Sequence, residues 1–258
     1  MDTPSSSISL VFASWDSFKL WWRSRLIGKQ PFQRGRFLFR GHGREDWPLR
    51  SYFDRRFQSP AGGQSLVGLA DELLTTFRTG LTDRGVARDV LEDPRLLHAF
   101  AQHHGVPTRL LDWSESPYVA AFFAYWYRFE HERDCRDEYF FVWVLDSSHP
   151  VWSGSWGAEI FSVPTNGNPR IRNQSGRFTL LRTHHDSLES FVRDAARAGI
   201  EVEGALTRLL LPASEATSAL QDLDVMGVGF ETLYPDVEGA ARAALLRCAI
   251  RHQVLIRP

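Results

Sequence analysis

Hydrophobic residues recur with helical spacing in several segments of the first half of the chain. Between residues 14 and 26 a broad aromatic stripe lies on one side of a helix, and segments 65–80 and 93–103 also predict helices. Ser116 and Pro117 precede an apolar run that reaches Trp126. Serine at the N-cap and proline at the first helical position favour a helix start. We therefore expect a largely buried helix here.

Aromatic and β-branched runs predict strands, chiefly in the second half. Residues 139–146 form the clearest run. Further strands are expected at 36–41, 108–113, 200–211 and 227–233, a strand pair or bulged strand at 170–182, irregular structure at 150–168, and helices at 187–198, 214–223 and 235–251. Because helices and strands do not alternate regularly, we predict an α+β fold. It would have a mixed or antiparallel central sheet and helices mainly from the N-terminal half.

Composition narrows the possible classes of protein. The chain has 258 residues, 43% of them hydrophobic, and a formal net charge of -1, which is typical of a globular protein. We predict one domain over 9–258 after a flexible polar tail at 1–8. The near-zero charge gives no general attraction to nucleic acid or membranes. No apolar run is long enough to cross a membrane, so a cytoplasmic location is expected. Cys135 and Cys248 predict neither a disulfide framework nor a zinc site.

Residues 102–126 concentrate polar side chains around a predicted strand, turn and helix. His103 and His104 precede a turn at Gly105. Arg109 and Asp112 lie three apart on the strand that follows, so they face opposite sides of the sheet. This pattern predicts a ligand site, and the alternative for the Arg109 and Asp112 pair is two buried structural anchors.

Arg40 lies at the end of a predicted strand, beside Gly41. Phe37 and Phe39 would face one side of the sheet, and Leu38 and Arg40 the other. A charge in this position is expected either to bind an anion or to pair internally, for example with Asp112. The common nucleotide-binding, metalloprotease and hydrolase motifs do not occur in the sequence.

Several motifs, in order, resemble the FRG domain family from about Phe37 to the end of the chain. They are Phe39-Arg-Gly, Trp47-Pro-Leu, Gln102-His-His-Gly-Val-Pro-Thr-Arg-Leu-Leu-Asp-Trp-Ser, Arg170-Ile-Arg-Asn-Gln-Ser-Gly-Arg-Phe-Thr and Thr232-Leu-Tyr-Pro-Asp-Val-Glu-Gly. Tyr234 stands where phenylalanine is commoner in the family, and Val237-Glu238 where Leu-Asp is commoner. The resemblance implies a fold like that of the ADP-ribosyltransferase superfamily, in which an arginine on the first core strand binds NAD.

The function that this resemblance implies is ADP-ribose transfer from NAD, or NAD hydrolysis, in a bacterial toxin, effector or phage-defence protein. NAD would be a substrate, no metal would be needed, and the acceptor would be an unknown protein or nucleic acid. A neutralising partner would be possible, and no membrane is implied. The alternative is a non-catalytic FRG module that binds a nucleotide or a partner. A further alternative is a nuclease that uses the histidines.

Residue roles follow from the chemistry of the nicotinamide–ribose bond, whose cleavage needs a cation, an aromatic slot, a polar group and a carboxylate. The predicted catalytic residues are Arg40, His104 and Glu231. Gln174 and Asp236 are alternatives to Glu231 for the late position, and the other interpretation of Glu231 is a solvent-facing strand residue. The predicted NAD-binding residues are Arg40, Gly41, His103, Thr108, Arg109, Asp112, Trp113, Ser114 and Gln174.

Overall fold

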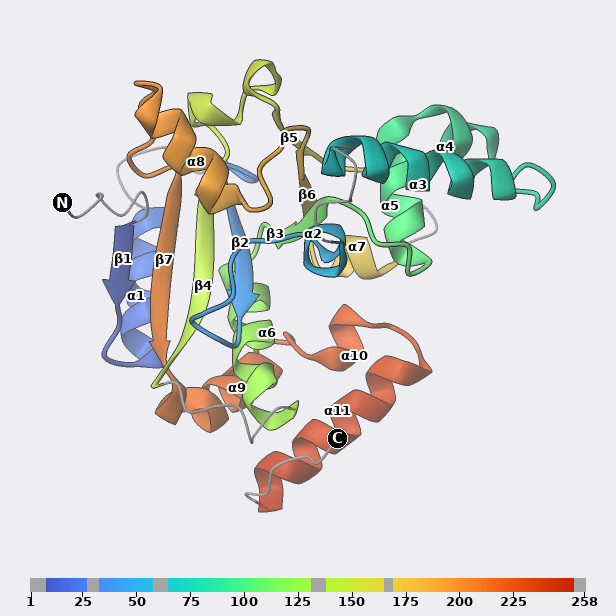
Figure 1. Cartoon of the computed structure of the whole chain (residues 1–258). Coiled ribbons are helices and arrows are strands. Elements are labelled where there is room, and N and C mark those ends of the chain that lie inside the picture. The colour runs from blue at the N-terminus through green and yellow to red at the C-terminus, as the bar shows by residue number, and fades with distance from the viewer. Residues whose placement is uncertain (1–7, 27–32, 58–64, 131–137, 165–168, 253–258) are drawn as a thin grey trace.

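The computed structural model describes the chain except residues 1–7, 27–32, 58–64, 131–137, 165–168 and 253–258. The described residues form a seven-stranded sheet in the order β1-β7-β4-β2-β3-β6-β5 (Figure 1). Its strands are β1 (Ile8–Val11), β2 (Phe37–His42), β3 (Leu110–Ser114), β4 (Tyr139–Asp146), β5 (Ala158–Phe161), β6 (Gly176–Leu181) and β7 (Leu206–Pro212). β1 pairs with β7 in parallel, and the other neighbours are antiparallel. The predicted mixed sheet is thereby confirmed.

Both faces of the central strands are covered. Phe140, Val142 and Val144 of β4 join a first core to which several helices contribute, and Trp143 and Leu145 face a second core. The first core packs under α1 (Trp15–Leu26), α6 (Pro117–Glu130) and α9 (Ala216–Val225), and the second under α8 (Leu188–Arg197). Because neither face of β4 is open to water, its sequence is a continuous apolar run rather than an alternating one.

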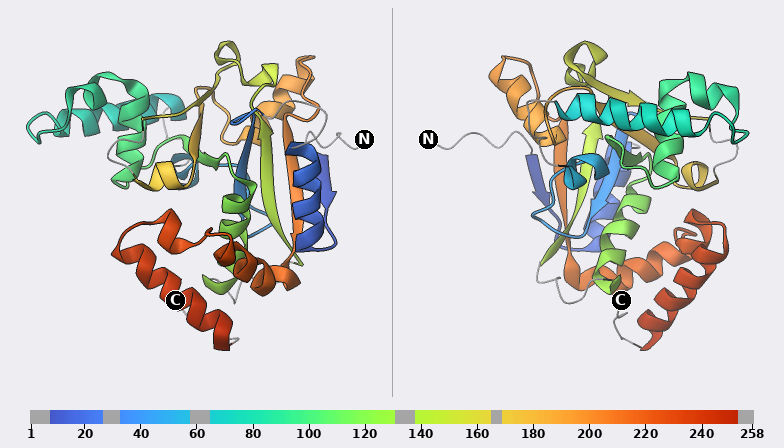
Figure 2. Two further views of the ribbon diagram at one scale, coloured as in Figure 1. Left: turned by 180° about the vertical axis from the view of Figure 1, so that it is seen from behind. Right: turned by 45° about the vertical axis from the view of Figure 1, so that its right-hand side comes forward.

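Two groups of helices extend from the same side of the sheet (Figure 2). One group comprises α2 (Tyr52–Arg56), α3 (Leu66–Gly80), α4 (Arg88–Glu92) and α5 (Pro94–His103), with the short α7 (Pro169–Asn173) beside it. The other comprises α10 (Phe230–Leu233) and α11 (Val237–His252). Short 3-10 turns occur at Pro150–Trp152, Gly154–Trp156 and Ala213–Glu215.

Local sequence signals placed many elements correctly. The Ser116 hydroxyl accepts a hydrogen bond from the amide of Val119 at 3.3 Å, as expected at the start of α6. β4 has the predicted bounds, and α1 and α8 each begin one residue after the predicted start. Residue 8 is the first residue of β1, and the rest of the predicted tail lies outside the described residues, as does Cys135.

Three segments differ from the prediction. The predicted strand at 227–233 contains the helix α10, because Phe230 and Leu233, three apart, both pack into the first core. The first part of the predicted strand pair at 170–182 is α7, and only β6 is extended. β5 lies in the segment expected to be irregular.

Helices come from both halves of the chain and not mainly from the N-terminal half, since α7 to α11 all follow residue 168. None of the described helices has the length and apolar character needed to cross a membrane.

Candidate functional site

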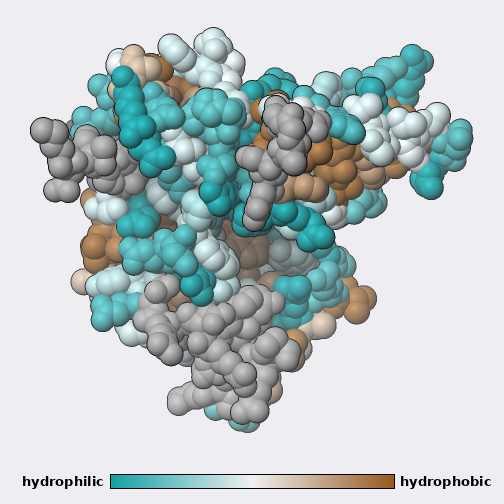
Figure 3. All heavy atoms as spheres, viewed as in Figure 1, coloured by the Kyte–Doolittle hydropathy of each residue, from teal (hydrophilic) through white to brown (hydrophobic). Residues whose placement is uncertain are grey.

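A cavity of about 490 Å³ opens where the sheet separates between β2 and β3. These strands are in register only through Phe39 and Ser114, whereas β2 pairs with β4 over six residues. The widening gap is lined from β2, β3, β6, α5, α6, α7 and the end of α10. In the space-filling view a hollow with hydrophobic atoms at its floor and hydrophilic atoms around it lies near the middle of the face (Figure 3).

The three residues of the Phe-Arg-Gly segment have different environments. Phe39 is buried in the first core, and Arg40 lines the cavity. Gly41 lies against α6, where an added Cβ would collide with the Ala120 carbonyl oxygen and lie 2.8 Å from the Ala124 amide nitrogen. The close approach of a helix backbone thus favours glycine here, and Gly41 also lines the cavity.

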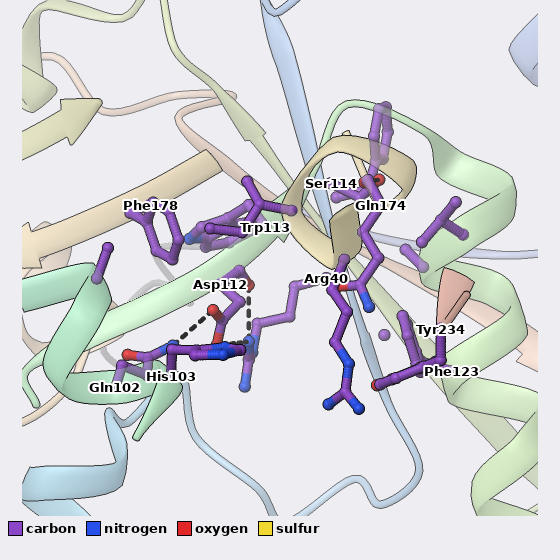
Figure 4. A pocket seen from close by; sticks show the side chains of 17 residues that line it. Arg40, Gln102, His103, Asp112, Trp113, Ser114, Phe123, Gln174, Phe178 and Tyr234 are labelled. Carbon is purple, nitrogen blue, oxygen red and sulfur yellow. Dashed lines mark hydrogen bonds and ion pairs between the residues drawn. The ribbon is translucent and has the colours of Figure 1, made fainter. Parts of the chain in front are cut away.

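Arg40 is held in place by two hydrogen bonds, one of which, to Asp112, is drawn in Figure 4. Its Nη1 donates to the backbone oxygen of Asp112 at 2.6 Å, and its Nε donates to Nε2 of His42 at 3.2 Å. Nδ1 of His42 lies 3.3 Å from the Trp47 carbonyl oxygen. Burial and the Arg40 charge lower the pKa of His42 to about 3, so the ring is neutral. The proton is therefore on Nδ1, and the guanidinium has a fixed orientation.

Asp112 faces the same cavity and is held from the other side. Gln102 Nε2 donates to the Asp112 carboxylate at 2.6 Å, and the Thr108 hydroxyl donates to Gln102 Oε1 at 2.7 Å. The carboxylate lies 3.9 Å from Arg40 Nη1 and keeps 59% of its side-chain surface open to the cavity. Desolvation by the cavity walls raises the pKa of Asp112, and Arg40 opposes this effect.

The opposite wall comes from segments far along the chain. Arg170 of α7 forms ion pairs with Asp236 at 2.7 Å and Glu238 at 2.9 Å, and its guanidinium lies 4.7 Å from the centre of the Tyr234 ring. Asp236 also accepts a hydrogen bond from the amide of Gly239 at 2.9 Å, so it caps the N-terminus of α11. Arg170, Tyr234 and Gln174 all line the cavity.

The two neighbouring histidines have different positions. His103 lines the cavity at the end of α5. His104 is the C-cap residue of α5, and its ring packs on Phe100 with the ring centres 4.4 Å apart. The sequence predicted His104 as the catalytic histidine, but its side chain is not among those lining the cavity. The two rings still touch edge to face, with centres 5.1 Å apart, but only His103 reaches the cavity.

Glu231 does not line the cavity either. It lies on α10, exposed, and its carboxylate pairs with Arg247 at 2.9 Å. The prediction placed it at the end of a strand, and the helical backbone turns it away instead. Among the described residues that line the cavity, Asp112 is the only carboxylate.

Arg109 and Thr108 do not line the cavity. Arg109 Nε forms a buried ion pair with Asp54 at 3.1 Å, and its other nitrogens donate to the backbone oxygens of Thr183, at 2.7 Å, and His185. Arg109 and Asp112 therefore face opposite sides, as predicted, and Arg109 fits the structural alternative. Thr108 acts on the cavity through Gln102.

Ser114 and Trp113 line the cavity, but their polar atoms are already bonded. The Ser114 hydroxyl donates to the Gln174 backbone oxygen at 2.7 Å and accepts from the amide of Ser116 at 3.0 Å. Trp113 Nε1 donates to the Thr179 hydroxyl at 3.0 Å. These contacts join β3 to the start of α6 and to β6, so both residues help to build the cavity walls.

Sequence reasoning assigned no role to Gln102, Arg170 or Tyr234. All three occur within the motifs that carried the family resemblance, so their residue types were visible. What the sequence did not show is that α5, α7 and the end of α10 converge on β3.

Comparisons with known proteins agree with the family resemblance. Residues 35–133 match the family model of the FRG domain, which supports the predicted relationship to that family. The matched part holds Arg40, Gln102, His103 and Asp112, and the wall with Arg170 and Tyr234 lies beyond it. No curated protein and no solved structure matched the chain.

Proposed function

We propose that the cavity binds NAD and that the protein cleaves its nicotinamide–ribose bond, transferring ADP-ribose to a protein or nucleic-acid acceptor or to water. The observation that carries this proposal is the meeting of Arg40, Arg170 and Asp112 on the walls of one cavity with aromatic lining. A fold of the ADP-ribosyltransferase type is part of the proposal. The separation of β2 from β3 supports it, because it opens the sheet at the first arginine.

The cations of the cavity suit a diphosphate. Arg40 and Arg170 come from opposite walls, and guanidinium groups match the geometry of phosphate oxygens. Burial is the main cause that lowers the pKa values of Arg40 and His42, and the nearby charge of Arg55 on α2 lowers both further. An anionic ligand would offset this mutual repulsion of positive charges, which gives a physical reason for binding.

The size and lining of the cavity suit the remainder of a dinucleotide. Its volume of about 490 Å³ lies within the usual range of small-molecule sites. Phe123, Phe178 and Tyr234 present aromatic rings to it, and such rings can stack on the flat faces of adenine or nicotinamide. Gln102, His103 and Gln174 provide polar groups for ribose hydroxyls.

The chemical step needs a negative charge near the ribose. When the bond between ribose C1′ and the nicotinamide nitrogen breaks, its electron pair leaves with nicotinamide. Positive charge then develops on the ribose, and the acceptor forms the new bond to C1′ and loses a proton. Asp112 takes the role that the sequence assigned to Glu231, because a carboxylate in the cavity can stabilise this charge or accept the proton.

Nicotinamide release from NAD tests the proposal directly. The purified chain is incubated with NAD, with and without added protein or nucleic acid, and nicotinamide and intact masses are followed. We expect release, and a mass gain of one ADP-ribose on any acceptor. Asp112→Asn should reduce the rate at least about 100-fold, as is typical of a lost acid–base or charge-stabilising group.

Exposed Arg182, which pairs with Glu159 away from the cavity, provides a matched control. Arg182→Ala should retain the rate. Full turnover in Asp112→Asn would exclude the proposed role of this carboxylate, and an absence of release at high enzyme concentration would exclude the activity.

A second candidate is nucleotide binding without cleavage. It is favoured by the hydrogen bonds that already hold Arg40 and Asp112, which make a well-ordered recognition surface without any reaction. It predicts a rise in melting temperature on adding nucleotide, sensitive to Arg40→Ala, with no nicotinamide formed.

A further inference from the structure

A second group of ligand-type side chains lies on the far side of Arg109 from the cavity. The chain bends at residues 183–184 between β6 and α8. Two consecutive side chains would point to opposite faces in a strand, but here the rings of His184 and His185 lie side by side, with centres 4.1 Å apart. Asp194 of α8 faces them, and the ligand atoms of all three residues lie within 4.8 Å of one another.

We propose that His184, His185 and Asp194 bind a divalent transition metal ion, with zinc as the best fit. This site is separate from the NAD cavity, and the inference does not rest on the proposed function. Two imidazoles and a carboxylate are typical zinc ligands, and the fourth tetrahedral position would be taken by water. Calcium and magnesium are less suitable, because they favour sites made of oxygen atoms alone.

The spacing of two ligand atoms already suits the ion. Nε2 of His185 lies 3.2 Å from Oδ2 of Asp194. Two atoms bound about 2.0 Å from a tetrahedral zinc are separated by about 3.3 Å, so an ion would replace this hydrogen bond with little movement. His184 is exposed, and its ligand atom lies within 4.8 Å of the ligand atoms of His185 and Asp194.

The second nitrogen of His185 has the partner that a metal ligand needs. Nδ1 of His185 lies 2.8 Å from the Thr183 hydroxyl. This hydroxyl donates to Nδ1 when Nε2 carries the proton, and it accepts from Nδ1 when Nε2 binds the ion. Such a partner fixes the tautomer and the plane of a ligating imidazole.

The loop that carries the histidines is held by the sheet. Arg109 donates to the backbone oxygens of Thr183 and His185, and Asp54 balances its charge. Arg197 binds Oδ1 of Asp194 at 3.0 Å and leaves Oδ2 directed at His185. The ligands are thus placed by groups outside the site, so binding does not have to order the loop.

Metal titration of the tag-free full chain tests the site. After treatment with a chelator, the protein is titrated with Zn²⁺ by calorimetry and with Co²⁺ by absorption spectroscopy. We expect one ion per chain, visible Co²⁺ bands of tetrahedral intensity, and a metal-dependent rise in melting temperature. His184→Ala and Asp194→Asn should each weaken Zn²⁺ binding at least about tenfold.

His252→Ala is the matched control, since it removes an exposed histidine on α11 outside the cluster and should leave binding unchanged. Because His184 is exposed, its variant should fold, and an unaltered melting temperature without metal verifies this. Equal Zn²⁺ affinity in His184→Ala and the wild type would overturn the proposal, as would no binding at millimolar Zn²⁺.

Discussion

Two arginine–aspartate pairs lie on opposite sides of the same strand, and they differ in what surrounds them. The side chains of Arg109 and Asp54 are 3% and 4% exposed, and Arg109 also binds two backbone oxygens. The side chains of Arg40 and Asp112 are 22% and 59% exposed and face a cavity. The first pair is buried and bonded within the protein, whereas the second pair keeps hydrogen-bonding capacity for a ligand.

This contrast shows why residue type alone does not assign a role. Both pairs include residues of the long motif that begins at Gln102, and both arginines adjoin or lie on core strands. A buried, fully bonded pair maintains the fold, because removing one partner leaves an uncompensated charge. A partly exposed pair adds less to stability, and the surface that it leaves open to the cavity can contact a ligand.

The largest effect is expected from the buried pair. Arg109→Ala leaves Asp54 buried without its partner and frees two backbone oxygens, so the free energy of unfolding should fall by about 3–5 kcal/mol. Denaturant unfolding followed by circular dichroism measures the change. Arg182→Ala, at an exposed pair, should change it by less than about 1 kcal/mol. Similar values for the two variants would contradict the structural role of Arg109.

A smaller loss is expected where the cavity wall is joined to α6. A methyl group at Gly41 meets the backbone of Ala120 and Ala124, so Gly41→Ala should lower the free energy of unfolding by about 1–3 kcal/mol. Gly80 has open space around its Cβ direction, and Gly80→Ala serves as the control with no loss expected. An unchanged free energy of unfolding in Gly41→Ala would show that β2 and α6 are less closely packed than described.

Arg40→Ala should weaken NAD binding without a large loss of stability. Because the pair with Asp112 is open to water, the free energy of unfolding should change by about 1 kcal/mol or less. The rise in melting temperature that NAD causes in the wild type should disappear, since a main phosphate contact is lost. The measurement is a thermal melt with and without NAD. A large loss of stability without NAD would place Arg40 with Arg109 as a structural residue.

The smallest expected effect is a change in how the free energy of unfolding depends on pH. The pKa of Asp112 is raised above 3.8 in the folded chain, so the native state holds this proton more tightly than the unfolded state does. Ionisation of Asp112 therefore lowers stability as the pH rises through the interval between 3.8 and the raised pKa. Asp112→Asn removes this decline, which unfolding curves at several pH values detect.

Asp46 should affect the pH dependence of stability in the opposite direction, and it serves as a comparison. Its hydrogen bond with Arg44 lowers the pKa of Asp46 below 3.8, so its ionisation stabilises the native state as the pH rises. Asp46→Asn should therefore lose stability at neutral pH relative to acid pH. The same pH trend in both variants would contradict the raised pKa of Asp112.

Much of the fold was predictable where local chemistry and packing agree. Ser116 and Pro117 specified a helix start, and the apolar run of β4 specified a strand. The segment around Phe230 could not be assigned in this way, because a short apolar run fits a strand or a single helical turn. Only packing of Phe230 and Leu233 against the first core decides between them.

The candidate site was also predictable only in part, because side-chain directions are easier to predict in strands than at helix ends. Arg40 and Asp112 were identified from their place at strand positions next to turns, and both line the cavity. His104 and Glu231 do not line this cavity, because the direction of a side chain changes by about 100° with each helical residue. An error of one residue at the end of α5, or a helix in place of a strand at α10, is enough to move a side chain out of the site.

The missing Cβ of Gly41 has a mechanical consequence. With no side chain between them, β2 and the first turns of α6 are in backbone contact, so we expect the wall that carries Arg40 to be rigid. We therefore expect any change in the width of the cavity to come from α5, α7 and the end of α10, which also line it. Such a change would alter the distance between Arg40 and Arg170, and with it the size of the anion that both can bind.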